Sequence, residues 1–118
     1  DFAPVPGQPG AVAARTTLGR RHQGYAGLGH GGLSAALLDA AMTNCLLAAG
    51  VPALTARMSL RYHQPVPLAV PLRVQAQPER RRGRWHRLRA ELHQAHSLLV
   101  SAEAEFMAQP GLDRGPTG

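Results

Sequence analysis

The run of residues 32–49 constrains the fold more than any other stretch of the sequence. It consists mostly of Ala, Leu and Met, which are strong helix formers, and Gly50 followed by Pro52 is a common helix stop. The predicted helix is apolar on almost every side, so we expect it to be buried at the centre of the molecule. A sheet built from the rest of the chain must therefore cover it.

Five further segments have the pattern of β-strands. Side chains alternate in character from Thr55 to Tyr62 and from Trp85 to Leu92, and this period of two is typical of antiparallel strands with one dry face. The predicted strands span 11–18, 53–62, 71–77, 84–93 and 98–107, with turns at 65–67, 80–83 and about 94–97. One strand, a long buried helix and four strands in succession predict an α+β fold, in which an antiparallel sheet embraces the helix.

The length of 118 residues suits one domain and is too short for two. We expect an irregular lead-in at 1–10, a domain at 11–108 and a flexible tail at 109–118, because both ends are rich in Pro and Gly. A domain of this size often completes its burial by self-association. We expect no membrane span or signal peptide, and the single Cys45, predicted to lie in the core, fits a reducing cytoplasm.

The basic charge admits an anionic partner but does not favour nucleic acid. The net charge is +6, and all thirteen basic residues are arginine, whose guanidinium binds phosphate oxygens in a bidentate way. Only 4% of the residues are aromatic, and no helix-turn-helix, zinc-finger or aromatic RNA-binding signature is present. A nucleic-acid-binding protein would show binding that falls steeply with salt.

A polar line runs along the predicted helix. At its start, Gly31 and Gly32 would leave backbone N–H groups without intrahelical partners, and a ligand can approach them closely. Such a terminus can act as an oxyanion hole. At about 100° per residue, Asp39 projects within about 20° of Gly32 and about 40° of Thr43.

A carboxylate on an apolar helix is costly to bury unless it is hydrogen-bonded or its pKa rises, and a raised pKa suits a general base. Spacing alone leaves a second interpretation equally open. Asp39 could simply accept hydrogen bonds from backbone or Arg groups, and Thr43 could bond back to the carbonyl four residues earlier.

Two segments resemble a known family. The segment 22–39, HQGYAGLGHGGLSAALLD, is similar to the signature of hotdog-fold acyl-CoA thioesterases, in particular the phenylacetate-pathway and hydroxybenzoyl-CoA branch. That family has an acid nine residues after the His of His-Gly-Gly, and His30 and Asp39 keep this spacing. The segment 55–68, TARMSLRYHQPVPL, resembles the family's second strand. The resemblance covers about residues 11 to 108.

The resemblance implies how the site is assembled. Two subunits would join their sheets edge to edge, sometimes with two dimers forming a tetramer, and the active site would lie at the dimer interface. The Gly31 N–H would polarise the thioester carbonyl, and Asp39 of the neighbouring subunit would act as base or nucleophile. Thr43 or Thr55 would orient water.

Other residues of the same loop and helix start would bind the substrate. These are Gln23, His30 and Gly32. Some relatives carry Asn or Gln seven residues before the oxyanion glycine, whereas this chain has Gly24 there, so Gln23 would substitute only if the loop shifts. Relatives also often have Glu after the Asp, where this chain has Ala40.

An arginine cluster, Arg80, Arg81 and Arg82 with Arg84, lies in a predicted turn before Trp85. Coenzyme A carries three phosphate groups, so these arginines could hold its nucleotide by charge-assisted hydrogen bonds. A solvated turn in an arginine-rich protein is the more common explanation of such a cluster. Arg57 and Arg61 on the second predicted strand have no assigned role.

Other catalytic arrangements fit less well. Ser34 lacks the strand-turn-helix context of a nucleophile elbow, and His93 with His96 has no neighbouring cysteine to complete a metal site. We therefore expect hydrolysis of an acyl-CoA thioester, without a cofactor or metal ion. A non-catalytic hotdog domain that binds acyl-CoA is the alternative, because one fold can host several functions.

Overall fold

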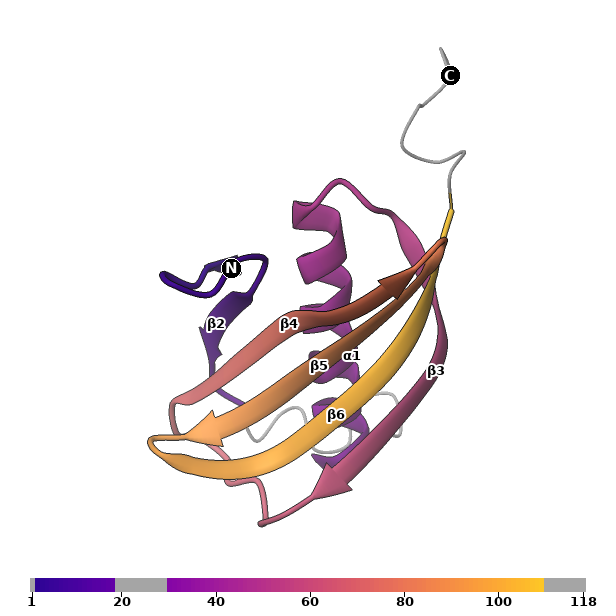
Figure 1. The fold of residues 1–118 in the computed structure, drawn as a ribbon. Helices are drawn as coiled ribbons and strands as arrows, with labels where there is room; N and C mark the ends of the chain where they lie inside the picture. The colour runs from indigo at the N-terminus through magenta and orange to yellow at the C-terminus, as the bar shows by residue number, and fades with distance from the viewer. Residues whose placement is uncertain (1, 19–29, 110–118) are drawn as a thin grey trace.

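The computed structural model describes residues 2–18 and 30–109, which form one helix and one six-stranded sheet (Figure 1). All strand pairs are antiparallel, and the order across the sheet is β1-β2-β4-β5-β6-β3. The elements are β1 (Ala3–Pro4), β2 (Val12–Thr16), α1 (His30–Ala48), β3 (Ala53–Tyr62), β4 (Leu72–Arg82), β5 (Trp85–Gln94) and β6 (Ser97–Ala108).

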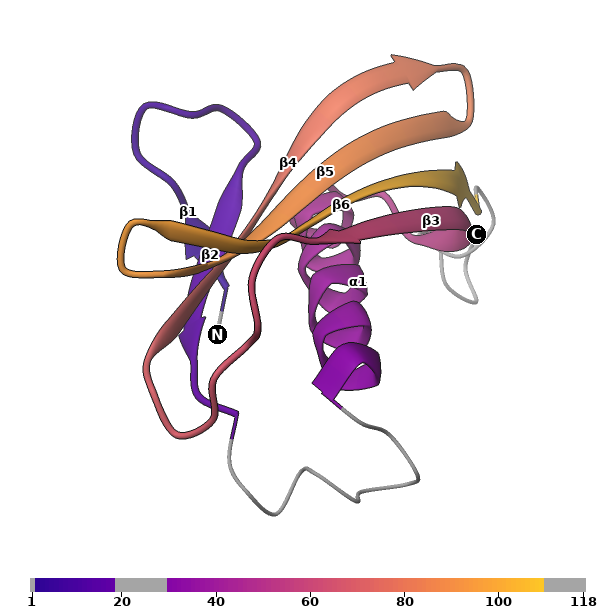
Figure 2. The same cartoon turned by 90° about the horizontal axis from the view of Figure 1, so that it is seen from below.

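Helix α1 lies against one face of the twisted sheet (Figures 1 and 2). Its fully buried side chains include Leu38 and Met42, which pack on inward-facing residues such as Leu88 and Phe106. The helix ends as predicted, because Gly50 has a positive φ of 79° and Val51 N–H donates to the Leu46 carbonyl at 2.8 Å. The α+β expectation is confirmed, and the architecture is that of a hotdog fold.

The sheet has a dry inner face and a charged outer face. Along β5, Leu88, Ala90 and Leu92 are buried against the helix, while the residues between them point outward. Cross-strand partners in an antiparallel pair share a face, so the register extends this assignment to β3, β4 and β6.

The β4–β5 connection differs from the prediction. Arg80, Arg81 and Arg82 belong to β4 rather than to a turn, and the turn contains only Gly83 and Arg84. Gly83 has a φ of 59°, which suits a two-residue hairpin, so the strands continue to this point. A register irregularity between Pro78 and Arg80 accommodates the proline within the strand.

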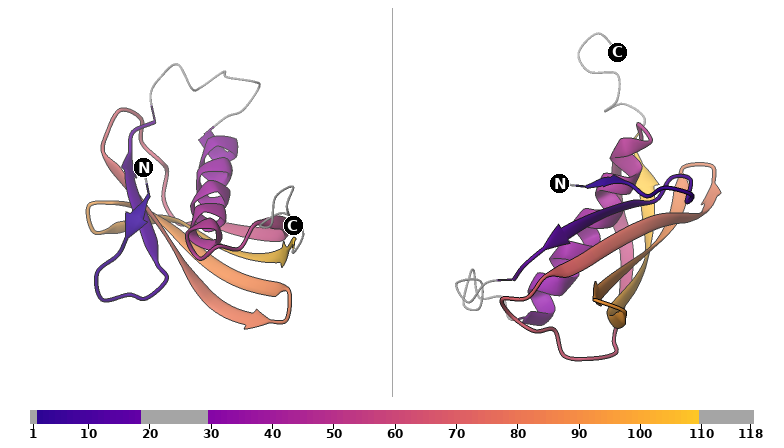
Figure 3. Two further views of the ribbon diagram at one scale, coloured as in Figure 1. Left: turned by 90° about the horizontal axis from the view of Figure 1, so that it is seen from above. Right: turned by 90° about the vertical axis from the view of Figure 1, so that its left-hand side faces the viewer.

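The N-terminal segment also contains more structure than predicted. Ala3–Pro4, inside the expected irregular lead-in, pairs with Val12 and Ala13 as β1. The connection between β1 and β2 lies over the end of α1, where the Cys45 thiol donates to the Gly10 carbonyl at 3.0 Å. Cys45 is in the core as expected, and burial raises the pKa of its thiol. Figure 3 shows this side of the molecule from two directions.

Contrary to the prediction, α1 is not buried on all sides. Ala36, Ala40 and Leu47 lie on a side that the single chain leaves exposed, with Leu47 52% exposed. The reason is geometric, because the sheet covers only one side of the helix (Figure 3). A helix without a polar face therefore presents apolar side chains to its surroundings.

Candidate active site

Asp39 and Thr55 meet at the boundary between helix and sheet. The Thr55 hydroxyl donates to Asp39 Oδ1 at 2.8 Å, an ordinary distance for an O–H···O hydrogen bond. Asp39 is partly buried and Thr55 is exposed. One carboxylate oxygen is thus held in place beside open space.

Local structure explains why these two side chains meet. Asp39 is near the middle of α1, on the side of the helix that faces β3. Thr55 is paired with the buried Phe106, so it points to the inner face of the sheet. A register irregularity between Thr55 and Arg57 then returns the following residues to the regular ladder.

The other predicted catalytic residues lie along the same helix. Because α1 begins at His30, Gly31 lies in the first turn, whose N–H groups lack intrahelical acceptors. Gly32 and Thr43 are partly buried, two turns before and one turn after Asp39. Gln23 lies outside the described residues, as does the side chain of His30.

The three arginines of the predicted cluster divide between the two faces of the sheet. Arg81 is paired with His86 on the inner face, and burial together with the charge of Arg81 lowers the pKa of His86. Arg80 and Arg82 are paired with Arg87 and Trp85 on the outer face. Only Arg81 therefore shares a face with Thr55.

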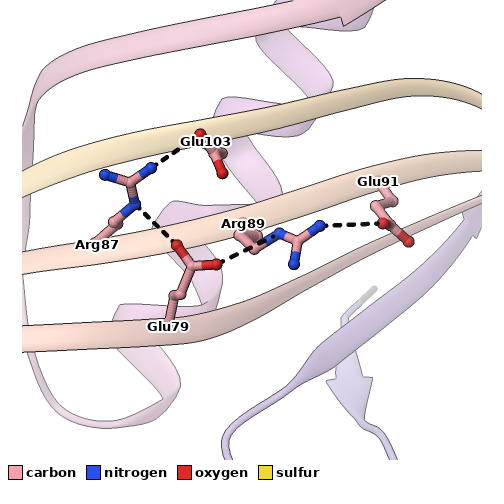
Figure 4. Close-up of polar contacts among 5 residues, drawn as sticks. All are labelled: Glu79, Arg87, Arg89, Glu91 and Glu103. Carbon is pink, nitrogen blue, oxygen red and sulfur yellow. Dashed lines mark hydrogen bonds and ion pairs between the residues drawn. The ribbon is translucent and has the colours of Figure 1, made fainter. Parts of the chain in front are cut away.

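The outer face carries a network of ion pairs between neighbouring strands (Figure 4). Arg87 Nε lies 2.8 Å from Glu79 Oε1, and Arg87 Nη2 lies 2.9 Å from Glu103 Oε1. Arg89 contacts the other oxygen of Glu79 at 3.5 Å and Glu91 at 3.8 Å. These charges satisfy one another, so the centre of this face offers little net attraction to a charged ligand.

The geometry argues against two other sites that the sequence offered, a Ser34 nucleophile and a histidine metal site. Ser34 is completely buried, so its hydroxyl is not placed to attack a substrate from solvent. His93 lies in β5, beside Glu91 at 2.9 Å, and no cluster of three or more His, Cys, Asp or Glu side chains suited to a metal occurs in the described part of the chain. Within the same residues, α1 is not long and apolar enough to cross a membrane.

The sequence did not predict one polar contact, which joins His63 and Ser101. His63 Nε2 lies 2.9 Å from Ser101 Oγ, although the two residues are 38 positions apart. They meet because the end of β3 runs beside β6. No carboxylate hydrogen-bonds to His63 among the described residues, so the pair lacks the third member of a catalytic triad.

Residues 26–101 match the family model of the thioesterase superfamily. A crystal structure of a thioesterase superfamily protein has 34% identity and a TM-score of 0.75, and the match covers 83% of this chain but only 49% of that protein. The chain thus spans about half the length of that relative. No curated protein matches the chain.

Two further structures are similar in fold. A phenylacetic acid degradation-related protein from Ralstonia eutropha has 24% identity and a TM-score of 0.77, over 91% of this chain and 83% of its own. A hypothetical thioesterase from Streptococcus pneumoniae, solved with coenzyme A, has 16% identity and a TM-score of 0.81, over 92% of this chain and 87% of its own. Variants of a hypothetical thioesterase from this organism have also been solved, one with an Asp and one with a Thr replaced by Ala.

Proposed function

Because the chain belongs to the thioesterase superfamily, we propose that it hydrolyses an acyl-CoA thioester to a carboxylic acid and coenzyme A. The observation that carries this proposal is the Thr55–Asp39 hydrogen bond of 2.8 Å. It fixes one oxygen of a partly buried carboxylate beside an exposed hydroxyl, and it leaves the other oxygen to act on a substrate.

The similar structures add support. The Streptococcus pneumoniae protein binds coenzyme A, and the Asp and Thr replaced in the two variants are separated by 16 residues, as Asp39 and Thr55 are here. Acetyl-CoA is bound to a related structure from Streptococcus mutans with 19% identity. These proteins share the fold, so the same pair of residue types at the same separation is the relevant similarity.

In the proposed reaction, Asp39 removes a proton from water as the water attacks the thioester carbonyl. The negative charge that develops on the carbonyl oxygen is stabilised by the Gly31 N–H at the start of α1. Collapse of the tetrahedral intermediate breaks the carbon–sulfur bond, and the CoA thiolate receives the proton. Gly32 has no side chain, so the substrate can approach this backbone closely.

Asp39 could instead attack the carbonyl directly, forming an anhydride that water then cleaves. In either route, the Thr55 hydroxyl fixes the orientation of the carboxylate, leaving Oδ2 for the reaction. Thr43, one turn along, would orient the water. Hydrolysis in ¹⁸O-labelled water under single-turnover conditions separates the routes, because only direct attack transfers ¹⁶O from Asp39 to the first product.

Among the remaining substrate contacts, we propose that Arg81 binds the phosphate groups of coenzyme A. It lies on the inner face in the same cross-strand row as Thr55, about 14 Å away across three strand spacings. The loop residue Gln23 and His30 at the helix start would contact the thioester end. Arg80 and Arg82 point to the opposite face and receive no role in this site.

The proposed site also requires a second copy of the chain. Strand β3 is an edge strand of ten residues without Pro or Gly, and no strand within residues 2–18 and 30–109 pairs with its outer edge. Such an edge is a template for pairing. Antiparallel pairing of two β3 strands would join the sheets and bring Gly31 of one subunit toward Asp39 of the other.

The decisive experiment measures thiol release from short, long and aryl acyl-CoAs by the wild type and by Asp39→Asn. We expect kcat to fall by about 10²- to 10⁴-fold, with acyl-CoA binding retained, because the amide cannot accept the proton. Glu103→Gln, which neutralises an outer-face carboxylate, is the matched control and should keep its activity. Tight binding without turnover by the wild type would instead identify a non-catalytic acyl-CoA-binding domain.

A further inference from the structure

A pocket of about 440 Å³ lies between the β1–β2 connection and the C-terminal end of α1 (Figure 3). Residues between Pro4 and Val12 form one wall, and Cys45, Ala48 and Ala49 form the other. Ala48 and Ala49 are exposed, so the pocket opens to solvent. Its volume falls within the range of small-molecule sites in proteins.

This pocket, which we call the N-terminal pocket, is separate from the candidate active site. Asp39, Thr43 and Thr55 do not line it. Ala48 follows Asp39 by nine residues in α1, which places it about 14 Å further along the helix axis and about 180° around it. A ligand in the N-terminal pocket would therefore leave the Asp39–Thr55 pair uncovered.

Hydrogen bonds of the chain itself hold the walls of the N-terminal pocket in place. Within the β1–β2 connection, Ala11 N–H donates to the Gln8 carbonyl at 3.0 Å. The Gln75 side chain donates to Gln8 Oε1 at 2.9 Å, which ties the connection to β4. The Cys45 thiol ties it to α1 through the Gly10 carbonyl at 3.0 Å. Because the walls are preformed, little of the chain has to be ordered when a ligand binds.

The walls of the N-terminal pocket are mostly apolar and uncharged. Apart from Gln8 and Cys45, the lining residues are Gly, Ala, Pro and Val. No charged side chain lines the pocket within the described ranges 2–18 and 30–109. Burial raises the pKa of the Cys45 thiol, so the sulfur stays neutral at neutral pH. These walls favour an apolar ligand body, because they offer contact area without a charge that must be desolvated.

The C-terminal end of α1 gives the N-terminal pocket a negative partial charge. The N–H groups of residues 49–51 cap the carbonyls of Leu46 and Leu47. In the part of the chain that the structure describes, the carbonyls of Cys45 and Ala48 receive no such N–H, and both residues line the pocket. The last turn of α1 also contains no basic residue. Unsatisfied carbonyls at a helix C-terminus attract cations.

We propose that the N-terminal pocket is a second ligand site, which binds a small primary amine carried on an apolar body. The apolar part would fill the space between the β1–β2 connection and Cys45, and the ammonium group would donate hydrogen bonds to the free carbonyls at the end of α1. A carboxylate of the same size would instead meet the negative end of the helix dipole. The acid that the proposed hydrolysis releases is therefore not the ligand of this pocket.

The test uses three probes of similar size that differ in charge: phenylbutylamine, phenylbutanol and phenylbutanoate. Titration calorimetry at low salt should give a Kd for the amine that is about threefold lower than for the alcohol and about tenfold lower than for the acid. Added salt should narrow these differences, because it screens the charge of the helix end.

Two variants of lining residues separate the effects of shape and charge. Ala48→Leu fills part of the pocket from the exposed helix end and should weaken the binding of all three probes by about tenfold. Ala49→Lys places a cation beside the free carbonyls, so it should weaken the amine and strengthen the acid by about threefold each, with little change for the alcohol. Ala3→Leu is the matched control, because Ala3 is exposed on β1 and does not line the pocket.

Equal affinity for the amine and the acid would overturn the proposal, because the helix end would then not select the ligand. An absence of binding, or binding that Ala48→Leu leaves unchanged, would show that the pocket is not a ligand site. A decrease in molecular mass on addition of the amine, measured by light scattering, would show that a second copy of the chain occupies the pocket instead. None of these outcomes depends on thioester hydrolysis, so the proposed function is tested separately.

Discussion

The two sides of helix α1 are built differently. Toward β3, the helix presents Asp39, whose hydrogen bond to Thr55 is accessible. Toward β1 and β2, it presents the buried Cys45, whose thiol donates to the Gly10 carbonyl beside a pocket of about 440 Å³. The same apolar helix thus supports an accessible polar pair on one side and a buried thiol contact on the other. This contrast supports the proposal that the first side serves chemistry and assembly, and it leads us to expect that the Gly10 side contributes to stability.

The two edges of the sheet show the same contrast. The β1 edge is only two residues long and contains Pro4, which lacks an N–H donor. The β3 edge is ten residues long and contains no Pro, although it has a register irregularity near Thr55. Natural proteins protect edges that must not pair. The difference therefore favours β3 over β1 as the edge for the proposed pairing with a second copy.

The largest effect is expected from a proline in β3. Backbone N–H groups alternate in direction along a strand. One of the two variants Ser59→Pro and Leu60→Pro therefore removes an N–H that bonds to β6, and the other removes an N–H that points away from the sheet. The first variant should be destabilised. The second should fold, remain monomeric at about 12.5 kDa in light scattering, and lose most thioesterase activity. A folded dimer in both variants would contradict pairing through β3.

A smaller effect is expected on the side of α1 that faces β1 and β2. Gly10 has a φ of 81°, and an added Cβ would lie 2.9 Å from Pro78 Cγ. Gly10→Ala should therefore lower the free energy of unfolding by about 2–3 kcal/mol, measured by urea denaturation. Gly7→Ala is the control, because its φ is 76° but nothing lies within 4 Å of the added atom.

Gly7→Ala should lower the free energy of unfolding by only about 1 kcal/mol, because only the strain of the positive φ contributes there. Both variants should keep the wild-type kcat below their melting temperatures, since neither touches the β3 side. Equal destabilisation would show that the close approach to Pro78 contributes nothing. A loss of kcat in the folded Gly10→Ala protein would contradict the proposal that the two sides of α1 have separate roles.

The smallest effect is expected at Thr55. Thr55→Val removes the donor to Asp39 but preserves the shape of the side chain, so kcat should fall by roughly tenfold with little change in KM. Thr55→Ser should restore most of the rate, because it retains the hydroxyl. An unchanged kcat in Thr55→Val would mean that the hydrogen bond does not position the carboxylate for the reaction.

Much of the fold followed from local patterns in the sequence. The helix and its end at Gly50 were predictable, because propensity and the glycine stop depend on neighbouring residues alone. The alternation along β3 and β5 likewise located both strands, and the turn at Ala95 and His96 was predicted between β5 and β6. Asp39 stood out because a single charge interrupts an apolar helix, and the segment 22–39, with its His30–Asp39 spacing, together with the segment 55–68 pointed to the family.

The remaining features depend on contacts between distant residues. No local signal distinguishes Arg81 from its neighbours, because the face each arginine takes is set by the register irregularity after Pro78. Thr55 became the partner of Asp39 only once β3 had packed beside the helix. The pocket beside Cys45 likewise exists only after the β1–β2 connection has packed against the end of α1. The sequence determined which elements form and which residue types they carry, whereas strand register decided which side chains meet, because one residue of shift exchanges the faces of a strand.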